Sequence, residues 1–469
     1  MKIEQIYTGC IAHAAYYIEN NGEAAIFDPL REVQPYIDRS TKDNAKIKYI
    51  FETHFHADFV SGHLDLAEKT GANIVFGPTA KPNFEAIIAE DNQEFKIGNY
   101  TIKAIHTPGH TLESTCYLLT DENGKDYGII TGDTLFIGDV GRPDLAQKLV
   151  KDLTQEKLAE YLFHSLRNKI MPLADDLIVF PNHGAGSACG KNMSKETTDT
   201  LGNQKKNNYA LRKDMTLEEF KTELLDGLLP PPAYFPQNVM MNIQGYESLD
   251  SIKEKANKPL TPKAFEMLAN QTEAVILDVR NEYDFIKEHI PNAIFIGLHG
   301  QFAPWVGALI RDVEQPILLI TPEGKEEETV TRLSRVGFDN TLGYLEGGIE
   351  AWKQSGYEID SIQSITPENF EKVYQNAKIV DARKPGEYVA EHVDKAINIP
   401  LDFINDHLSE IPKEETFYVH CAGGYRSVIW ASIMKARGYH NMINIEKGMA
   451  GLRNTAIPLT NYVCPSTLK

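Results

Sequence analysis

The segment Thr53-His54-Phe55-His56-Ala57-Asp58-Phe59 directly follows the apolar run Ile47 to Phe51. Three side chains that can bind a metal, His54, His56 and Asp58, occupy alternate positions in this segment. If the run is a strand that continues to Asp58, its period of two turns all three side chains to one face. Imidazole and carboxylate groups at the end of a strand are typical ligands of a transition metal.

Three later apolar runs end in the same way, in a short turn followed by a possible ligand. Tyr100 to Ile105 leads to His110, Tyr127 to Ile130 leads to Asp133, and Leu177 to Phe180 leads to His183. A single histidine after a strand is more often a hydrogen-bonded structural residue than a ligand. Four strand ends of this kind together indicate a metal site.

The motif HFHAD at residues 54–58, with His110, Asp133 and His183, resembles the metallo-β-lactamase superfold. The resemblance implies an αββα sandwich with a metal at one edge, between the two sheets. Most hydrolases of this superfamily, including the glyoxalase II type, have HxHxDH and bind two metals. Phe59 stands at the last position of that motif here, so the second metal pocket has lost a nitrogen ligand and gained an apolar ring.

His54, His110 and Asp133 remain as two imidazoles and one carboxylate. This is the facial ligand set that leaves open positions on a non-haem Fe(II) for O₂ and substrate. Within the superfamily it is similar to the persulfide dioxygenases, which implies one Fe(II) per chain. Ligand types alone do not name a metal, so zinc at His54, His56 and His110 stays an alternative.

The same resemblance gives roles to further side chains. His56, Asp58 and His183 would orient the ligands or the substrate. Arg142, in the segment DVGRPD at residues 139–144, matches an arginine that binds the carboxylate of the thiol carrier. A guanidinium fork suits a carboxylate. The alternative for Arg142 is a salt bridge that fixes its loop.

Two further segments belong to this region. Cys189 lies in the glycine-rich loop GAGSACG at residues 184–190, where we expect an accessible thiol that accepts a sulfane sulfur or lines the cleft. The segment Leu228 to Gln237 contains the run Pro230-Pro231-Pro232, Tyr234 and Phe235. It is predicted to cover the cleft, contact a neighbouring subunit or tether the next domain.

A polar segment, Ser248 to Pro259, is predicted to be the linker before an internal repeat. VILDVR at residues 275–280 matches IVDAR at residues 379–383, with Asp278 and Asp381 in register. Each copy alternates strand and helix patterns, which is typical of a parallel sheet covered by helices. The predicted domains are therefore residues 1–247, 260–358 and 364–469.

The second copy contains a strand, FYVH, followed by CAGGYRS at residues 421–427 and a helix. Cys421 is expected in an anion cradle of backbone N–H groups that includes Gly423 and Gly424. The helix dipole and Arg426 favour the thiolate, so its pKa is expected below the free value of about 8.5. This copy resembles the rhodanese sulfurtransferase domain, with Cys421 at the persulfide-carrying cysteine and Arg426 at the loop arginine. Thr321 stands at the cysteine position of the first copy, which is expected to be a chemically inert spacer or docking surface.

The whole chain is similar to bacterial fusions of a persulfide dioxygenase with a sulfurtransferase. The resemblance implies that a low-molecular-weight persulfide and O₂ give sulfite and thiol at Fe(II). Cys421 would then transfer sulfane sulfur to sulfite and give thiosulfate, which detoxifies sulfide. The alternative is a dizinc thioester hydrolase of the glyoxalase II type, fused to a sulfur-trafficking module. The sequence does not identify the thiol carrier.

The composition of the 469 residues limits the remaining function classes. A formal charge of −19 predicts an acidic surface and argues against nucleic-acid binding. No apolar run approaches the roughly 20 residues that span a bilayer, and the first ten residues do not resemble a signal peptide. Five cysteines without CxxC spacing are typical of free thiols in a reducing cytoplasm. We therefore expect a cytoplasmic homo-oligomer, a dimer or tetramer, with small-molecule partners.

Overall fold

The computed structural model describes residues 2–144 and 153–463. It divides into two compact units, one built mainly from residues 1–252 and the other mainly from residues 253–469. Among the described residues, no helix is both long enough and apolar enough to cross a membrane.

The first unit contains two six-stranded sheets. One has the strand order β1-β2-β3-β4-β5-β6 and the other β12-β11-β10-β9-β8-β7. The strands are β1 (Lys2–Thr8), β2 (His13–Asn20), β3 (Glu23–Phe27), β4 (Lys46–Phe51), β5 (Asn73–Phe76), β6 (Ile87–Ile88), β7 (Glu94–Ile97), β8 (Tyr100–His106), β9 (Thr115–Thr120), β10 (Asp126–Gly132), β11 (Ile178–Pro181) and β12 (Asp199–Thr200).

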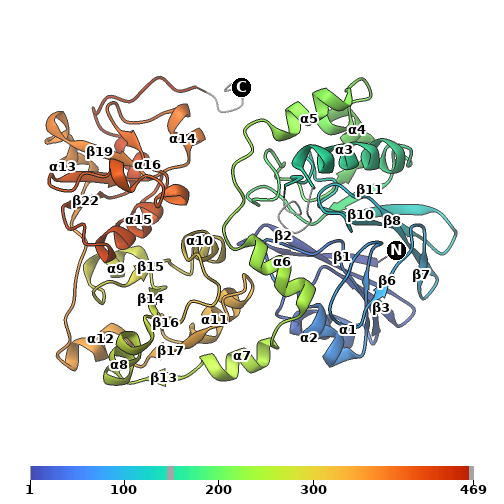
Figure 1. Cartoon of the computed structure of the whole chain (residues 1–469), viewed down its shortest axis with the longest axis horizontal. Helices are drawn as coiled ribbons and strands as arrows, with labels where there is room; N and C mark the ends of the chain where they lie inside the picture. The colour runs from blue at the N-terminus through green and yellow to red at the C-terminus, as the bar shows by residue number, and fades with distance from the viewer. Residues whose placement is uncertain (1, 145–152, 464–469) are drawn as a thin grey trace. The chain divides into compact units, whose positions relative to one another are not determined.

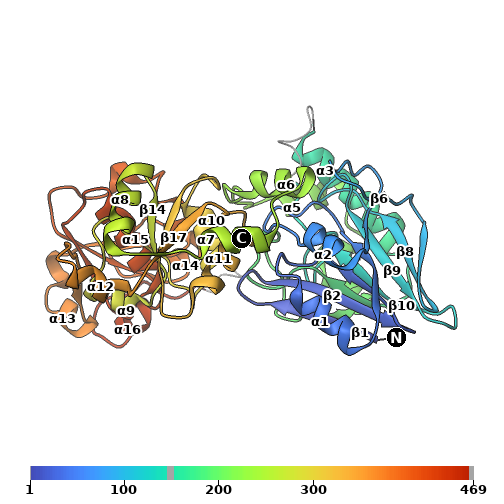
Figure 2. The same cartoon turned by 90° about the horizontal axis from the view of Figure 1, so that it is seen from below.

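Helices cover the outer faces of both sheets, which gives four layers in the order helix, sheet, sheet, helix (Figure 1). Figure 2, seen from the side of α1 and α2, shows these two helices in front of the first sheet. The helices of the first unit are α1 (Gln34–Lys42), α2 (His63–Thr70), α3 (Gln155–Ser165), α4 (Leu201–Asn207), α5 (Leu217–Leu225), α6 (Phe235–Gln244) and α7 (Leu249–Ala256).

Two apolar cores hold these layers together. Aromatic side chains from both sheets, including Phe27, Phe51 and Tyr117, fill the space between the sheets. A second core joins the second sheet to the helices that cover it, through Ile129 of β10 and Leu162 of α3 among others. Each strand therefore contributes alternate side chains to opposite faces, as its sequence pattern predicts.

The structure corrects one prediction about this half of the chain. Strand β4 ends at Phe51 and does not continue to Asp58, because the Thr53 N–H donates to the Asp28 carboxylate at 2.8 Å instead of to a neighbouring strand. The boundary between the units, at residues 252 and 253, falls within the predicted linker, which contains helix α7 with Leu249, Ile252 and Ala256 buried at helical spacing.

The second unit contains two five-stranded sheets, and the strand pairs in both are parallel. The first copy comprises β13 (Pro259–Leu260), α8 (Pro262–Thr272), β14 (Val275–Asp278), α9 (Glu282–Lys287), β15 (Ile294–Phe295), α10 (Phe302–Leu309), β16 (Ile317–Ile320), α11 (Glu326–Ser334), β17 (Thr341–Leu345) and α12 (Gly348–Gln354). The second comprises β18 (Ser364–Ile365), α13 (Pro367–Glu371), β19 (Lys378–Asp381), α14 (Pro385–Ala390), β20 (Ile397–Asn398), β21 (Phe417–His420), α15 (Tyr425–Ala436), β22 (Met442–Ile445) and α16 (Gly448–Leu452).

The two sheets have the same topology, β13-β17-β16-β14-β15 and β18-β22-β21-β19-β20. In each copy the first carboxylate of the repeated motif binds the guanidinium two residues later. The shortest distances are 2.7 Å for Arg280 and Asp278 and 2.6 Å for Arg383 and Asp381. The internal repeat predicted from the sequence is therefore a structural repeat.

Candidate metal centre and cysteine loop

The structure brings His54, His110 and Asp133 together at one edge of the first unit. One nitrogen from each ring and one carboxylate oxygen lie within 4.8 Å of one another, and all three residues are buried. Asp133 Oδ2 is 3.4 Å from His110 Nε2 and 3.9 Å from His54 Nε2. Neither His110 Nε2 nor Asp133 Oδ2 has a hydrogen-bond partner among the described residues. Because buried polar atoms are normally paired, this donor set fits a bound cation.

The loops after β4, β8 and β10 deliver these three side chains to the same place. Gly132, directly before Asp133, has a φ of +52°, and a Cβ there would lie 2.6 Å from Thr53 Oγ1. Glycine is therefore needed where the loop of Asp133 meets the loop of His54.

The second polar atom of each candidate ligand is held by a neighbour. His54 Nδ1 lies 2.9 Å from Thr53 Oγ1, and His110 Nδ1 lies 2.8 Å from the Arg142 carbonyl. Asp133 Oδ1 lies 2.8 Å from His183 Nδ1. A ring that donates through Nδ1 leaves the lone pair of Nε2 for a metal, so these contacts fix the tautomers that ligation requires.

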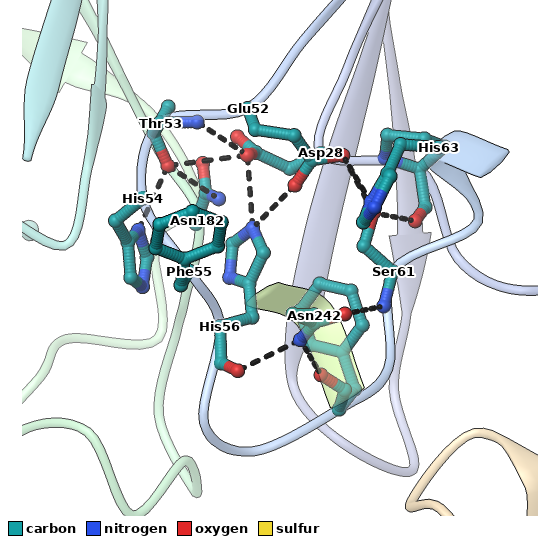
Figure 3. A network of polar contacts seen from close by, with 12 residues as sticks. Asp28, Glu52, Thr53, His54, Phe55, His56, Ser61, His63, Asn182 and Asn242 are labelled. Carbon is teal, nitrogen blue, oxygen red and sulfur yellow. Dashed lines mark hydrogen bonds and ion pairs between the residues drawn. The ribbon is translucent and has the colours of Figure 1, made fainter. Parts of the chain in front are cut away.

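His56 points into a different buried cluster, which Figure 3 shows. Its Nε2 lies 2.9 Å from Asp28 Oδ1 and 3.4 Å from Glu52 Oε2. Burial disfavours the charged ring, but the two carboxylates outweigh it and raise the pKa of His56 to about 10. The Asp28 carboxylate also accepts the Thr53 N–H, so His56 helps to hold the loop of His54. Since His56 Nδ1 has no partner among the described residues, the zinc set His54, His56 and His110 stays a second interpretation.

Asp58, His183 and Cys189 form a further group whose ligand atoms lie within 4.8 Å of one another. His183 Nε2 lies 2.9 Å from Asp58 Oδ2. Burial opposes ionisation of Asp58, but the neighbouring His183 dominates and lowers the pKa of this carboxyl to about 2. His183 thus connects Asp58 to Asp133 through its two nitrogens. Phe59, beside this group in the sequence, is fully buried and stacks on His56 at 4.3 Å.

The expectation that Cys189 has an accessible thiol is wrong. Cys189 is 1% exposed, and burial raises the pKa of its thiol well above the usual value. Its loop packs inward because backbone groups pair there: the Cys189 carbonyl accepts from Arg142 N, and the Asp139 carboxylate accepts from Lys191 N and Asn192 N. The many glycines made this loop resemble an open one.

Arg142 is 5% exposed, and its guanidinium group donates to other groups of the protein. Its Nε and Nη2 donate to the Asp144 carboxylate at 2.6 and 2.7 Å, and Nη1 and Nη2 donate to the carbonyls of Ala188 and Leu229. These are the contacts of the loop-fixing alternative, and binding of a substrate carboxylate stays a prediction for this residue.

Sequence reasoning missed the residues that hold the metal-binding loop from α6. The Asn242 amide donates to the carbonyls of His56 and Phe59 at 2.8 and 2.9 Å, and its oxygen accepts from Ser61 N (Figure 3). Tyr234, just before α6, donates to the Asp58 carbonyl. The aromatic segment with the triple-proline run thus leads into a helix that packs on the loop. An asparagine 180 or more residues away in sequence gives no local signal of such a role.

Cys421 follows β21, and its Sγ accepts a hydrogen bond from Gly424 N at 3.2 Å. Gly424 has a φ of +112° and directly precedes α15. The backbone cradle predicted from the sequence therefore includes at least this one donor to sulfur. A cavity of about 370 Å³ opens over Cys421, and its lining includes Gln301, Trp305, Lys384, Glu387, Gly423 and Arg426.

Arg426 is not free to act on Cys421 alone. Its two terminal nitrogens donate to the Glu387 carboxylate at 2.6 and 2.9 Å. Burial lowers the pKa of this guanidinium, but the Glu387 carboxylate outweighs burial and raises it overall. The arginine is therefore already paired with a carboxylate.

Comparison with known proteins gives two family matches. The model of the metallo-β-lactamase superfamily matches residues 8–183, and the model of the rhodanese-like domain matches residues 261–355 and 366–455. A solved structure of a metallo-β-lactamase from Staphylococcus aureus subsp. aureus COL is 30% identical, with a TM-score of 0.65. The match covers 74% of this chain and 98% of the Staphylococcus aureus chain.

Curated relatives match about a third to a half of the chain. A hydroxyacylglutathione hydrolase of Rhizobium etli is 34% identical over 169 residues, which are 35% of this chain and 58% of that protein. A hydroxyacylglutathione hydrolase of Dictyostelium discoideum is 28% identical over 249 residues, which are 52% of this chain and 85% of that protein. Together with the fold, these matches show that the chain belongs to the metallo-β-lactamase superfamily and carries two rhodanese-like domains after its metallo-β-lactamase domain.

Proposed function

We propose that the chain oxidises low-molecular-weight persulfides with O₂ to sulfite and thiol, and that Cys421 then transfers sulfane sulfur to sulfite. The observation that carries the proposal is the convergence of His54, His110 and Asp133. Two imidazoles and one carboxylate suit a single Fe(II). The buried ring of Phe59 stands where dimetal relatives have a further histidine.

A non-haem Fe(II) in such a ligand set supplies O₂ activation and leaves positions for substrate. The protein's own groups supply geometry. Thr53, the Arg142 carbonyl and His183 each fix the orientation of one ligand. Burial of all three ligands keeps bulk water away from the reacting sulfur.

The overall oxidation balances as RS–SH + O₂ + H₂O → RSH + H₂SO₃. The outer sulfur is oxidised, O₂ is reduced, and the thiol leaves unchanged. In the second reaction the Cys421 thiolate attacks the outer sulfur of RS–SH and RS⁻ leaves, so that Cys–S⁻ + RS–SH → Cys–S–SH + RS⁻. Backbone donation from Gly424 to Cys421 Sγ stabilises the thiolate before the sulfur arrives and after it has left.

A thioester hydrolase of the hydroxyacylglutathione type is the second candidate. Two observations favour it: the names of the curated relatives, and the group Asp58, His183 and Cys189, which offers oxygen, nitrogen and sulfur donors beside the first site. A hydrolase of this type would hold two metals and need no O₂.

The two candidates separate in one experiment. Iron-loaded protein is given persulfides of glutathione, coenzyme A and bacillithiol, and O₂, sulfite and thiosulfate are measured separately. We expect one iron per chain and O₂ consumption that Asp133→Ala abolishes. Asp126→Ala, at the start of β10, should leave O₂ consumption intact. A parallel sample is loaded with zinc and given a glutathione thioester; two zinc ions per chain with thioester hydrolysis there, and no O₂ uptake by the iron-loaded protein, would instead establish the hydrolase.

A further inference from the structure

The cavity over Cys421 is built by two domains. Cys421, Lys384 and Arg426 come from the second rhodanese-like copy, whereas Gln301 and Trp305 come from the first, which lacks the cysteine. Gln301 directly precedes α10, and Trp305 is a buried residue within it. The chemically inert copy therefore supplies part of the wall of the reactive site.

Specific contacts fix this arrangement. The Tyr425 hydroxyl, at the start of α15, donates to the Gly297 carbonyl at 2.7 Å. Phe295 N donates to Ser432 Oγ at 3.0 Å in a buried contact. A Cβ at Gly300 would lie 2.5 Å from the Tyr425 ring, so the chain segment before α10 packs tightly on the start of α15. Gln301 follows that segment directly, which holds Trp305 at the cavity.

The charges in the cavity are unequal. Glu387 pairs with both terminal nitrogens of Arg426, and Asp402 adds a second negative charge near the same guanidinium. Lys384 is exposed, and no ion pair of its ammonium group with a described residue is found. An anion that enters the cavity therefore meets Lys384 as its available cation.

The position of Lys384 is also unfavourable for the local fold. It stands at the N-cap of α14 without a side-chain cap hydrogen bond. The matching residue of the first copy, three positions after the repeated aspartate, is Asn281, and its side chain accepts from Asp284 N and caps α9. Lysine cannot accept such a bond, so this copy keeps only the reverse contact of the cap, in which the Glu387 carboxylate accepts from Lys384 N at 3.3 Å. Because Lys384 is a poor N-cap residue and lines the cavity of Cys421, it is a candidate for a functional role.

We propose that Lys384, in the cavity that Gln301 and Trp305 help to line, is the acceptor subsite of Cys421 and favours an oxyanion over an uncharged thiol. The inference rests on the transferase half of the proposed function. Lys384 binds the oxygens of sulfite. The sulfite sulfur attacks the outer sulfur of the Cys421 persulfide, and the electron pair of the breaking S–S bond returns to Cys421 Sγ. The balance is Cys–S–S⁻ + SO₃²⁻ → Cys–S⁻ + S₂O₃²⁻.

The proposal is tested on the full chain with Cys421 loaded as a persulfide. Lys384→Gln should raise KM for sulfite about tenfold with kcat almost unchanged, because it removes one charge-assisted contact. Activity towards the uncharged acceptor 2-mercaptoethanol should not change. Lys413→Gln removes an exposed lysine outside the cavity lining and should change neither value. An unchanged KM for sulfite in Lys384→Gln, or an equal loss with both acceptors, would overturn the role of Lys384.

A binding measurement separates this inference from the proposed function. Sulfite is titrated calorimetrically into the full chain carrying Cys421→Ser, with and without Lys384→Gln. Weaker binding in the double variant supports the subsite even if the wild-type chain makes no thiosulfate, a result that would sink only the proposed transferase. Equal binding in both would overturn the subsite even if thiosulfate forms.

Discussion

The two rhodanese-like copies share a frame and differ in one loop. In the second copy, the N–H of the residue three positions after Cys421 donates to sulfur, and Arg426 stands five positions after it. In the first copy Thr321 replaces the cysteine, and Glu326 stands at the arginine position. Glu326 Oε1 lies 3.2 Å from both Gly324 N and Thr321 Oγ1.

In the first copy the Glu326 carboxylate therefore accepts the loop N–H that, in the second copy, donates to Cys421 Sγ. Because this internal carboxylate already occupies the N–H, the loop of the first copy does not need to bind an external anion. Sheet order and the aspartate–arginine clamp are the same in both copies. The comparison shows that the frame depends on buried pairs far from the loop, and that reactivity depends on a few residues within it.

The largest effect should come from Cys421→Ser. Thiosulfate formation should fall to background, because serine cannot carry a persulfide, while sulfite formation and O₂ consumption continue at the metal centre. Separate assays of sulfite and thiosulfate check this. Thr321→Ser is the matched change in the other copy and should have no effect. Undiminished thiosulfate from the Cys421→Ser variant would contradict the division of labour.

A second effect tests the shared frame. Arg383→Met and Arg280→Met each leave a buried aspartate without its partner, and breaking such a pair costs about 3–5 kcal/mol. The cost should be larger for Arg383. Burial raises the pKa of Asp278 despite Arg280, so this carboxyl takes up a proton more readily when its partner is lost. Urea unfolding followed by hydrogen exchange in β14 and β19 gives both values. A smaller cost for Arg383 than for Arg280 would contradict this account.

Much of this frame was predictable from local sequence. Apolar alternation gave the strands that carry His110, Asp133 and His183, and equal spacing gave the repeat. The convergence of His54, His110 and Asp133 followed from the ends of their strands. Such features depend on residues close in sequence, because the period of the apolar residues shows which face of a strand or helix is buried.

What sequence reasoning missed depends on distant contacts. Asp28, Glu52 and Asn242 hold the loop of His54 and His56 from other elements, and none lies in a recognisable motif. The glycines around Cys189 predicted an open loop, but pairing of its backbone with Asp139 closes it. The glycine content of a loop indicates which backbone conformations it can adopt. Whether the loop is open or packed depends on its hydrogen-bond partners elsewhere in the chain.

The clamps should also respond differently to acid. Burial raises the pKa of Asp278, whereas for Asp381 burial is outweighed by His420 and Arg383 and the pKa is lowered. A lowered pKa contributes stability above the unfolded value of about 3.9, which is lost as pH falls through the folded pKa. A raised pKa contributes below about 3.9 and is lost as pH rises through the folded pKa.

Acidification from pH 6 to about pH 3 should therefore open β19 more readily and protect β14. Each change is partial until the carboxyl has titrated through its folded pKa, and a whole unit of pKa shift then corresponds to about 1.4 kcal/mol. Hydrogen exchange across this pH range checks it, corrected for the intrinsic exchange rate. Asp381→Asn should flatten the response of β19. Parallel pH profiles in the two strands would contradict the assignment of opposite shifts.

The smallest effect is expected of Thr321→Cys, which tests the difference between the two copies directly at the position of the cysteine. The new thiol should stay almost free of persulfide when the chain is treated with glutathione persulfide, because Glu326 already accepts from Gly324 N and repels an anionic donor. Adding Glu326→Arg frees that N–H and restores the charge of the active copy, so the double variant should gain persulfide at residue 321. Mass spectrometry of the peptide that contains this residue measures both. If the Thr321→Cys variant forms as much persulfide at residue 321 as at Cys421, Glu326 does not block the first copy. The first copy would then lack reactivity only because it has no cysteine.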